Sequence, residues 1–433
     1  MQVGCSASAL RGVMPTMEAA LLETTVAWEQ EGQTSGEVRE SMGAVDETCL
    51  EQMLLVCLDL PTGSLLLAAV AEERTSPPWK ALVEERLTAL GAHVRYVVSD
   101  RAKALLHLAE TGLECLSMPA CFHVIHDLVQ SSALTMGQRW RHAQQELTKA
   151  QEALARRQGR RHGEQDTAEA QAWVAARQAE LTRGDEAHHS YRGHLEPLSR
   201  TLHPFRLSDS TPQTAAQVES QLTATVEASE VFAPCPQLPA RHDTMAKVRQ
   251  QLPALAALVD FWWDGVPQDL APCRLSPRWQ QWGHECRLPR VYWATQGPRT
   301  RCRRRKATIQ EALDTVCAAF AQHPITPRLA PQVLAAWQAG ATDRVKAFQR
   351  ASSAVEGRNG ILSQLPHNQR GLPTRRAKVW TVLHNCDCRA ADGTTPASRF
   401  FRQAVPDLFE TVVSQVEDLP RPRQRNQIMA RSS

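Results

Sequence analysis

Three carboxylates stand out because of the elements in which the sequence places them. Asp46 lies in a short predicted strand, and Asp100 lies at the end of the apolar segment 94–98, after Ser99. Glu356 is the only acidic residue among the eight basic residues that occur from Arg344 to Lys378. Carboxylate oxygens bind hard divalent cations, and basic side chains neutralise phosphates. This combination predicts a site that binds phosphate while holding a metal.

The segment around Glu356 has the pattern of an amphipathic helix over residues 352–365. At about 100° per residue, its apolar stripe and its polar side separate cleanly. The apolar stripe consists of Ala354, Val355, Ile361, Leu362 and Leu365, and the polar side of Ser352, Ser353, Glu356, Asn359, Gly360 and Ser363. Gly357 and Gly360 each weaken a helix by roughly 1 kcal/mol relative to alanine. Close approach of another backbone is the usual compensation.

Each carboxylate also has a simpler interpretation. Glu356 alone fits a solvated helix residue paired with Arg358, Asp100 fits a helix N-cap, and Asp46 fits a turn residue. A strand interior, the end of a neighbouring strand and a helix can nevertheless converge at one edge of a sheet. We therefore expect these three acids to form one metal cluster.

The elements that would position these acids are predicted best between residues 43 and 130. Apolar strands, turn residues and amphipathic helices alternate there, which predicts a mixed sheet covered by helices. After the Asp46 strand come strands at 53–60 and 64–70 around the turn Pro61–Gly63, a helix at 79–90, a strand at 94–98, a helix at 102–110, a strand at 114–118 and a helix at 122–128.

The composition changes from residue 131 to 345, which we interpret as a mainly helical insertion. Residues 138–183 predict long solvated helices that break near Gly159, and seven of the eleven tryptophans fall between Trp173 and Trp337. Six of the eight residues from Arg299 to Lys306 are basic. The remaining parts are an N-terminal helical segment (1–42), a second part of the catalytic domain (346–400), and a C-terminal helix with a basic tail (401–433).

The composition of the 433 residues excludes several classes of protein. With 42% hydrophobic and 22% charged residues, the chain is not disordered as a whole. Its longest apolar run, Leu65–Ala71, is too short to span a membrane, and the N-terminus shows no secretion signal. Twelve cysteines without CxxC pairs predict reduced thiols in the cytoplasm. Glycine-rich nucleotide loops and the GxSxG motif are absent from the sequence.

The order of these features resembles the RNase H-like DDE transposases of bacterial insertion sequences, which are mobile elements. The segments that carry the resemblance are MLLVCLDLPTGSLLLAAV, VVSDRAKAL, CFHVIHDL and SSAVEGRNGILSQLPHNQRG. It covers residues 43–130 and 346–400. It implies an α/β fold, namely an RNase H-like mixed sheet flanked by helices and interrupted by a large, mainly helical insertion.

The resemblance also implies an activity, metal-dependent cleavage and strand transfer of DNA. Asp46, Asp100 and Glu356 would bind two Mg²⁺ (or Mn²⁺) ions for phosphoryl transfer at element ends and target DNA. Such enzymes act as homo-oligomers assembled on double-stranded DNA, in the bacterial cytoplasm at the nucleoid and without a membrane. The DNA backbone would be bound by Arg358, Arg370, Arg301, Arg303, Arg304, Arg305 and Lys306.

Several alternatives stay open. Asp59 competes with Asp46, but Asp46 is preferred because the first catalytic Asp of the family precedes the hairpin. Residues 1–42 show no helix-turn-helix, which predicts a truncated copy. The chain would then be a non-catalytic DNA-binding remnant, and a nuclease of the same fold is a further alternative. We interpret His123 and His126 as structural, the His384–Cys388 segment as unsuited to zinc, and the tryptophans as core.

Overall fold

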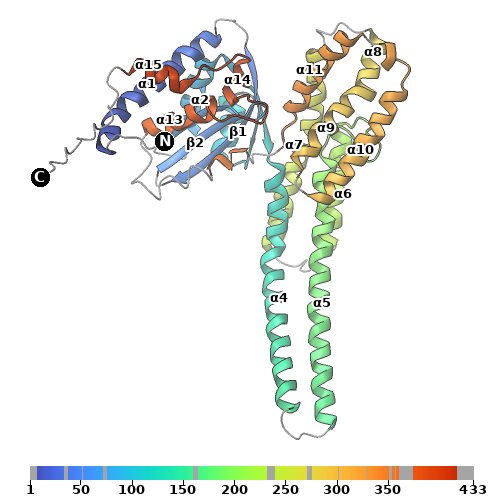
Figure 1. Ribbon diagram of the computed structural model, residues 1–433. Helices are drawn as coiled ribbons and strands as arrows, with labels where there is room; N and C mark the ends of the chain where they lie inside the picture. The colour runs from blue at the N-terminus through green and yellow to red at the C-terminus, as the bar shows by residue number, and fades with distance from the viewer. Residues whose placement is uncertain are drawn as a thin grey trace, which may run out of the picture. The chain divides into compact units, whose positions relative to one another are not determined.

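A computed structural model shows two compact units (Figure 1). The sheet unit contains residues 1–117 and 352–433, and the helical unit contains residues 118–351. The structure describes residues 7–33, 38–50, 52–71, 76–158, 164–231, 239–270, 276–300, 302–328, 330–350, 354–355, 357–359 and 374–416.

The sheet unit is built on a five-stranded mixed sheet with the order β3-β2-β1-β4-β5. Its strands are β1 (Arg39–Leu50), β2 (Gln52–Asp59), β3 (Leu65–Ala71), β4 (Ala92–Ser99) and β5 (Leu116–Pro119). β1 pairs antiparallel with β2 and parallel with β4, and β2 pairs antiparallel with β3. The mixed α/β class and the mainly helical region that follows the sheet are thus confirmed.

Helices cover the sheet because its central strands are apolar on both faces. Val45, Cys57 and Val97 share one face with helices α1, α2, α13 and α15 in a single hydrophobic core (Figure 1). Ala44 and Val98, on the opposite face, are also fully buried. The helices of this unit are α1 (Ala7–Gln33), α2 (Ser76–Leu90), α3 (Lys103–His107) with a π-helical turn (Leu108–Gly112), α13 (Thr374–Cys386), α14 (Pro396–Phe401) and α15 (Leu408–Gln415).

Turn chemistry and one side chain fix the hairpin of β2 and β3. Gly63 has a φ of +75°, a left-handed conformation that favours glycine. Asn385 of α13 accepts a hydrogen bond from the Leu65 N–H (2.8 Å) and donates one to the Leu65 carbonyl (2.9 Å). The amide therefore pairs with the backbone of edge strand β3, which would otherwise expose these groups.

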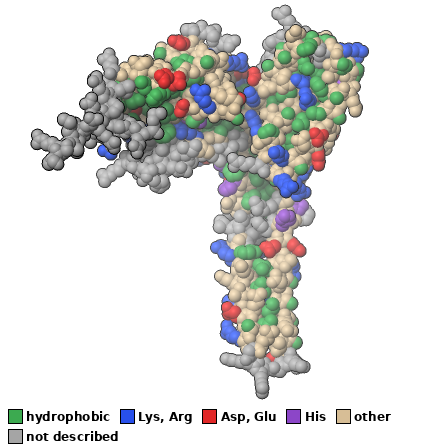
Figure 2. Space-filling model, in the orientation of Figure 1, with side chains coloured by type: hydrophobic (Ala, Val, Ile, Leu, Met, Phe, Trp, Pro, Cys, Tyr) green, Lys and Arg blue, Asp and Glu red, His purple; other side chains and the backbone are tan. Residues whose placement is uncertain are grey.

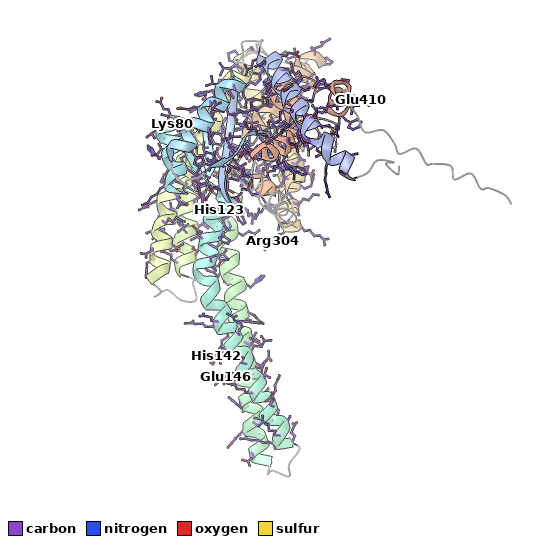
Figure 3. All side chains as sticks on the ribbon, turned by 90° about the vertical axis from the view of Figure 1, so that its left-hand side faces the viewer. Lys80, His123, His142, Glu146, Arg304 and Glu410 are labelled. Atoms are coloured by element: carbon purple, nitrogen blue, oxygen red, sulfur yellow. The ribbon has the colours of Figure 1, made fainter. Side chains whose placement is uncertain are left out.

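The helical unit contains a long antiparallel helix pair and a bundle. The pair consists of α4 and α5, each 38 residues long, and α4 ends at Gln158, next to the predicted break (Figure 1). Hydrophobic, acidic and basic side chains all occur along its visible surface (Figure 2), and His142 and Glu146 lie on successive turns of α4 (Figure 3). The helices are α4 (Cys121–Gln158), α5 (Glu164–Thr201), α6 (Ala215–Val231), α7 (Pro239–Leu270), α8 (Pro277–Trp282), α9 (Leu288–Arg299), α10 (Arg303–Gln322) and α11 (Pro331–Ala347).

Aromatic side chains fill the interior of the bundle. Trp262 is 2% exposed, and its indole N–H donates a hydrogen bond to the Arg344 carbonyl (2.8 Å). Phe205, Tyr292 and Phe348 pack around it with ring centroids 5.8 to 6.2 Å away. The interpretation of the tryptophans as core therefore holds for Trp262, which offers no exposed face for stacking on a base, but not for Trp173 of α5, which is 38% exposed.

All four predicted domain limits fall inside observed elements. Residue 43 lies in β1, residue 131 in α4, residue 346 in α11 and residue 401 in α14. The N-terminal segment is not separate, because Ala20, Leu21 and Trp28 of α1 are buried in the core of the sheet unit. Among the described residues, no helix combines the length and apolar character that crossing a membrane requires.

Candidate active site

The pairing of β1 with β4 brings Asp46 and Asp100 to the same level of the sheet. Ala44 pairs with Val98 in this parallel ladder. Asp46 lies two residues beyond Ala44, and Asp100 lies two residues beyond Val98. Asp46, inside β1, and Asp100, just after the end of β4, therefore lie at about the same level of two adjacent strands.

Asp100 lies where the chain turns sharply after β4. Its side chain is exposed, and Oδ1 accepts a hydrogen bond from the Ala102 N–H at 2.9 Å. Arg101 adopts a left-handed conformation with a φ of +61°. Helix α3 begins at Lys103 with Ala102 as its cap residue, so Asp100 is not the N-cap that the simpler interpretation required.

Asp46 is half-buried in β1 and receives hydrogen bonds from two directions. Oδ1 accepts from the Glu47 N–H (2.9 Å), and Oδ2 accepts from Nδ2 of Asn359 (2.7 Å). The neighbouring Glu47 points to the opposite face, where its carboxylate accepts a hydrogen bond from Trp79 Nε1 (2.9 Å). The side chains of Asp46 and Asn359 thus connect positions that are 313 residues apart in the sequence.

Arg358 and Asn359 belong to the sequence segment that also contains Glu356, and both are buried; Asn359 contacts Asp46. Arg358 is 5% exposed and Asn359 is 7% exposed. Nε and Nη2 of Arg358 and Oδ1 of Asn359 are buried, and none of these three atoms has a hydrogen-bond partner among the described residues. Burial lowers the pKa of Arg358, and the nearby Cys388 thiol partly offsets this shift.

These groups fit a site for a hard divalent cation. The orphaned Asn359 oxygen and the carboxylates of Asp46 and Asp100 are the oxygen ligands that Mg²⁺ and Mn²⁺ prefer. A buried arginine with unpartnered donors suits a phosphate that accompanies such a cation. We refer to Asp46, Asp100, Arg358 and Asn359 as the Asp46 site.

The third predicted carboxylate, Glu356, lies outside the described residues, and so does Arg370. Across the described ranges, no three His, Cys, Asp or Glu side chains gather closely enough to hold a metal. The three-carboxylate cluster therefore stays a prediction.

Asp59, the competing first aspartate, has a structural role. It is 2% exposed and accepts hydrogen bonds from Ser41 Oγ (2.7 Å), the Met42 N–H (3.2 Å), and both the N–H (3.1 Å) and the hydroxyl (2.5 Å) of Thr62. Burial raises its pKa, although these hydrogen bonds act in the opposite direction. Asp59 joins the β2–β3 turn to β1.

The predicted basic run lies at the start of α10 in the helical unit. Arg303, Arg304 and Lys306 are exposed, Arg305 is half-buried, and Arg301 lies outside the described residues. Arg304, labelled in Figure 3, is 3.7 Å from a carboxylate oxygen of Glu196. The first turn of α10 contains no acidic residue. Its cations and its helix dipole therefore both favour anions.

The remaining motifs show structural contacts. The rings of Phe122 and His126 stack with centroids 5.8 Å apart, and His126 lies 4.0 Å from Asp127. His384 contacts the Gly63 carbonyl at 2.9 Å, and Cys386 is buried, which raises its pKa to about 12. Within the described parts of the chain, neither segment presents three His, Cys, Asp or Glu side chains that could hold a metal.

Comparison with known protein families yields a partial match. A model of a family of unknown function, DUF6399, matches residues 284–428, about a third of the chain. This region includes α10, Arg358 and Asn359. Neither the curated proteins nor the solved structures contain a match to this chain.

Asn359 is the residue of this site that sequence reasoning did not select. The helical pattern placed it on the same side as Glu356, but asparagine on a polar helix side is common. Its only sequence signal was that position, three residues after the predicted catalytic acid. Its contact with Asp46 is a tertiary feature.

Proposed function

We propose that the chain is a metal-dependent DNA transposase of the RNase H-like DDE class. The strand order β3-β2-β1-β4-β5, with β4 parallel to β1, supports this proposal because it is the arrangement expected for that class. The observation that carries it is the Asp46 site, where a shared register aligns Asp46 with Asp100. The Asn359 contact brings a residue that comes three positions after Glu356 in the sequence to the same strand.

Each residue would have a distinct task in phosphoryl transfer. Asp46, Asp100 and Glu356 would hold two Mg²⁺ or Mn²⁺ ions, and the chemistry that such ions would supply is activation of the attacking oxygen and charge stabilisation on the leaving oxygen of the phosphodiester. Arg358 would neutralise phosphate charge with its unpartnered donors. The attack needs no covalent intermediate with the protein.

DNA binding would extend to α10 of the helical unit. Arg303, Arg304 and Lys306 are exposed there and would contact phosphates without reading base sequence. The first turn of α10 would add backbone N–H groups to these contacts.

The test is strand cleavage of a supercoiled plasmid that carries the sequences flanking this gene, with Mg²⁺ or Mn²⁺. We expect nicking and strand transfer by the natural chain, and a loss of at least about 100-fold in Asp46→Asn and in Glu356→Gln, because transition-state charge stabilisation is lost. The matched control is Asp392→Asn, which changes an exposed turn residue of the sheet unit and should retain activity.

The other outcomes distinguish the alternatives. Free DNA ends without joining would indicate a nuclease of this fold. Salt-sensitive DNA binding without nicking would indicate a non-catalytic remnant. Full activity in Asp46→Asn would refute the assignment of the site.

A further inference from the structure

Two consecutive residues of the Asp46 site, Arg358 and Asn359, have buried polar atoms without a hydrogen-bond partner among the described residues, which is unusual. Within the described parts of the chain, Oδ1 of Asn359 has no donor, although Nδ2 of the same amide donates to Asp46 at 2.7 Å. Leaving a buried polar group without a hydrogen bond costs about 1–3 kcal/mol, so such atoms are rare unless a ligand satisfies them.

The buried Asn385 of the sheet unit shows what a purely structural role looks like. Asn385 is 6% exposed, and its amide oxygen and nitrogen both bond to the backbone of Leu65. Asn359 is as deeply buried, at 7%, yet only its nitrogen has a partner among the residues that the structure describes. The two residues are therefore equally buried, but they differ in whether both polar atoms of the amide have a hydrogen-bond partner.

We propose that Asn359 is a positioning residue of a divalent-cation site. Nδ2 fixes Asp46 Oδ2, and Oδ1 accepts a hydrogen bond from the hydration water of the cation that Asp46 binds. This inference rests on the proposed function and names a residue that the three-carboxylate prediction lacks.

The physical reason is that a carboxylate ligand needs a defined orientation. Asp46 is half-buried on a strand, and the hydrogen bond from Asn359 selects one rotation of its carboxyl group. Partners of this kind around metal ligands typically contribute about 10–100-fold to metal affinity. An amide is suited to both tasks, since it donates to a carboxylate and accepts from a metal-bound water.

The experiment measures Mn²⁺ binding to the full chain by the electron paramagnetic resonance signal of free Mn²⁺. We expect Asn359→Ala to weaken Mn²⁺ affinity about 10-fold or more. Asn385→Ala, the matched control, should lower the melting temperature and leave Mn²⁺ affinity unchanged. Asp46→Asn should abolish binding at this site.

A second variant keeps the proposal testable if Asn359→Ala does not fold. Asn359→Asp preserves the shape of the side chain but places a second carboxylate beside Asp46. We expect a lower melting temperature than the natural chain without Mn²⁺, and recovery when Mn²⁺ is added, because the cation neutralises the repulsion.

The outcomes separate this inference from the proposed function. Unchanged Mn²⁺ affinity in Asn359→Ala, together with abolished binding in Asp46→Asn, would overturn the role of Asn359 alone. Absence of Mn²⁺ binding by the natural chain would overturn both proposals.

Discussion

Two aspartates on neighbouring strands of the same sheet have opposite surroundings. Asp59 is 2% exposed and bound by donors from β1 and from its own turn. Asp46 is half-buried, and the residue that contacts it, Asn359, has an amide oxygen without a partner in the described structure. A carboxylate enclosed by local donors stabilises a turn, whereas one beside unpartnered buried atoms suits ligand binding.

The helical unit provides a second enclosed polar group. His203 is 1% exposed; its Nδ1 lies 2.5 Å from the Tyr292 hydroxyl, and its Nε2 lies 3.2 Å from Nη1 of Arg350. Arg350 can only donate, so Nε2 is the acceptor and Nδ1–H donates to Tyr292. Like Asp59, His203 is a buried polar residue whose side-chain atoms have hydrogen-bond partners, and its role is structural.

The largest effect on stability should come from replacing the enclosed aspartate. Asp59→Ala leaves the donors of Ser41, Met42 and Thr62 without their acceptor, and we expect the free energy of unfolding to fall by roughly 3 kcal/mol. Asp46→Ala should cost about 1 kcal/mol or less without metal, because the Asp46 side chain is only half-buried and water can replace its hydrogen bonds. Urea unfolding measures the stability of both variants. Equal losses of unfolding free energy would contradict the assignment of a structural role to Asp59 and a ligand-binding role to Asp46.

The next effect is a dependence of stability on pH in the helical unit. Burial, with Arg350 and Arg305, holds the pKa of His203 well below its usual 6.5. The unfolded chain therefore takes up a proton that the folded chain does not, and stability present above pH 6.5 is lost as the pH falls below it. Between about pH 7.5 and 5.5 we expect stability to fall by about 1.4 kcal/mol from this group.

The measurement for His203 is urea unfolding across this pH range in the natural chain and in His203→Gln. Burial also lowers the pKa values of His284 and His384, which act in the same direction, so the difference between the two chains isolates His203. If the free energy of unfolding changed with pH equally in both chains, the pKa of His203 would not be lowered by folding.

The smallest effect concerns the exposed cations of α10. Replacing Arg303, Arg304 or Lys306 by Ala should reduce the slope of log affinity against log salt by about 0.9 for each DNA phosphate that the variant no longer binds. Arg95→Ala, which removes a half-buried arginine paired with Glu40 in the sheet unit, is the control for loss of a positive charge elsewhere. Filter binding to duplex DNA at several salt concentrations measures this slope. Unchanged slopes in all three variants would exclude this surface from DNA binding.

Local patterns predicted much of the sheet unit. The apolar runs predicted β2, β3 and β4 within a few residues, and Gly91, with a φ of +57°, ends α2 as predicted. These features depend on side-chain alternation and on turn residues that act over a few positions. The order of the elements was sufficient to favour Asp46 over Asp59.

The sequence by itself determined the elements of this protein and the residue types available at their ends. Tertiary structure alone decided that Asn359 contacts Asp46 across 313 residues, that Arg358 is buried, and that α1 joins the core of the sheet. Hydrophobic periodicity indicates which side of a helix or strand is buried, but it does not indicate which other segment packs against that side. Such partners are set only when distant segments pack together and the remaining polar atoms find donors and acceptors.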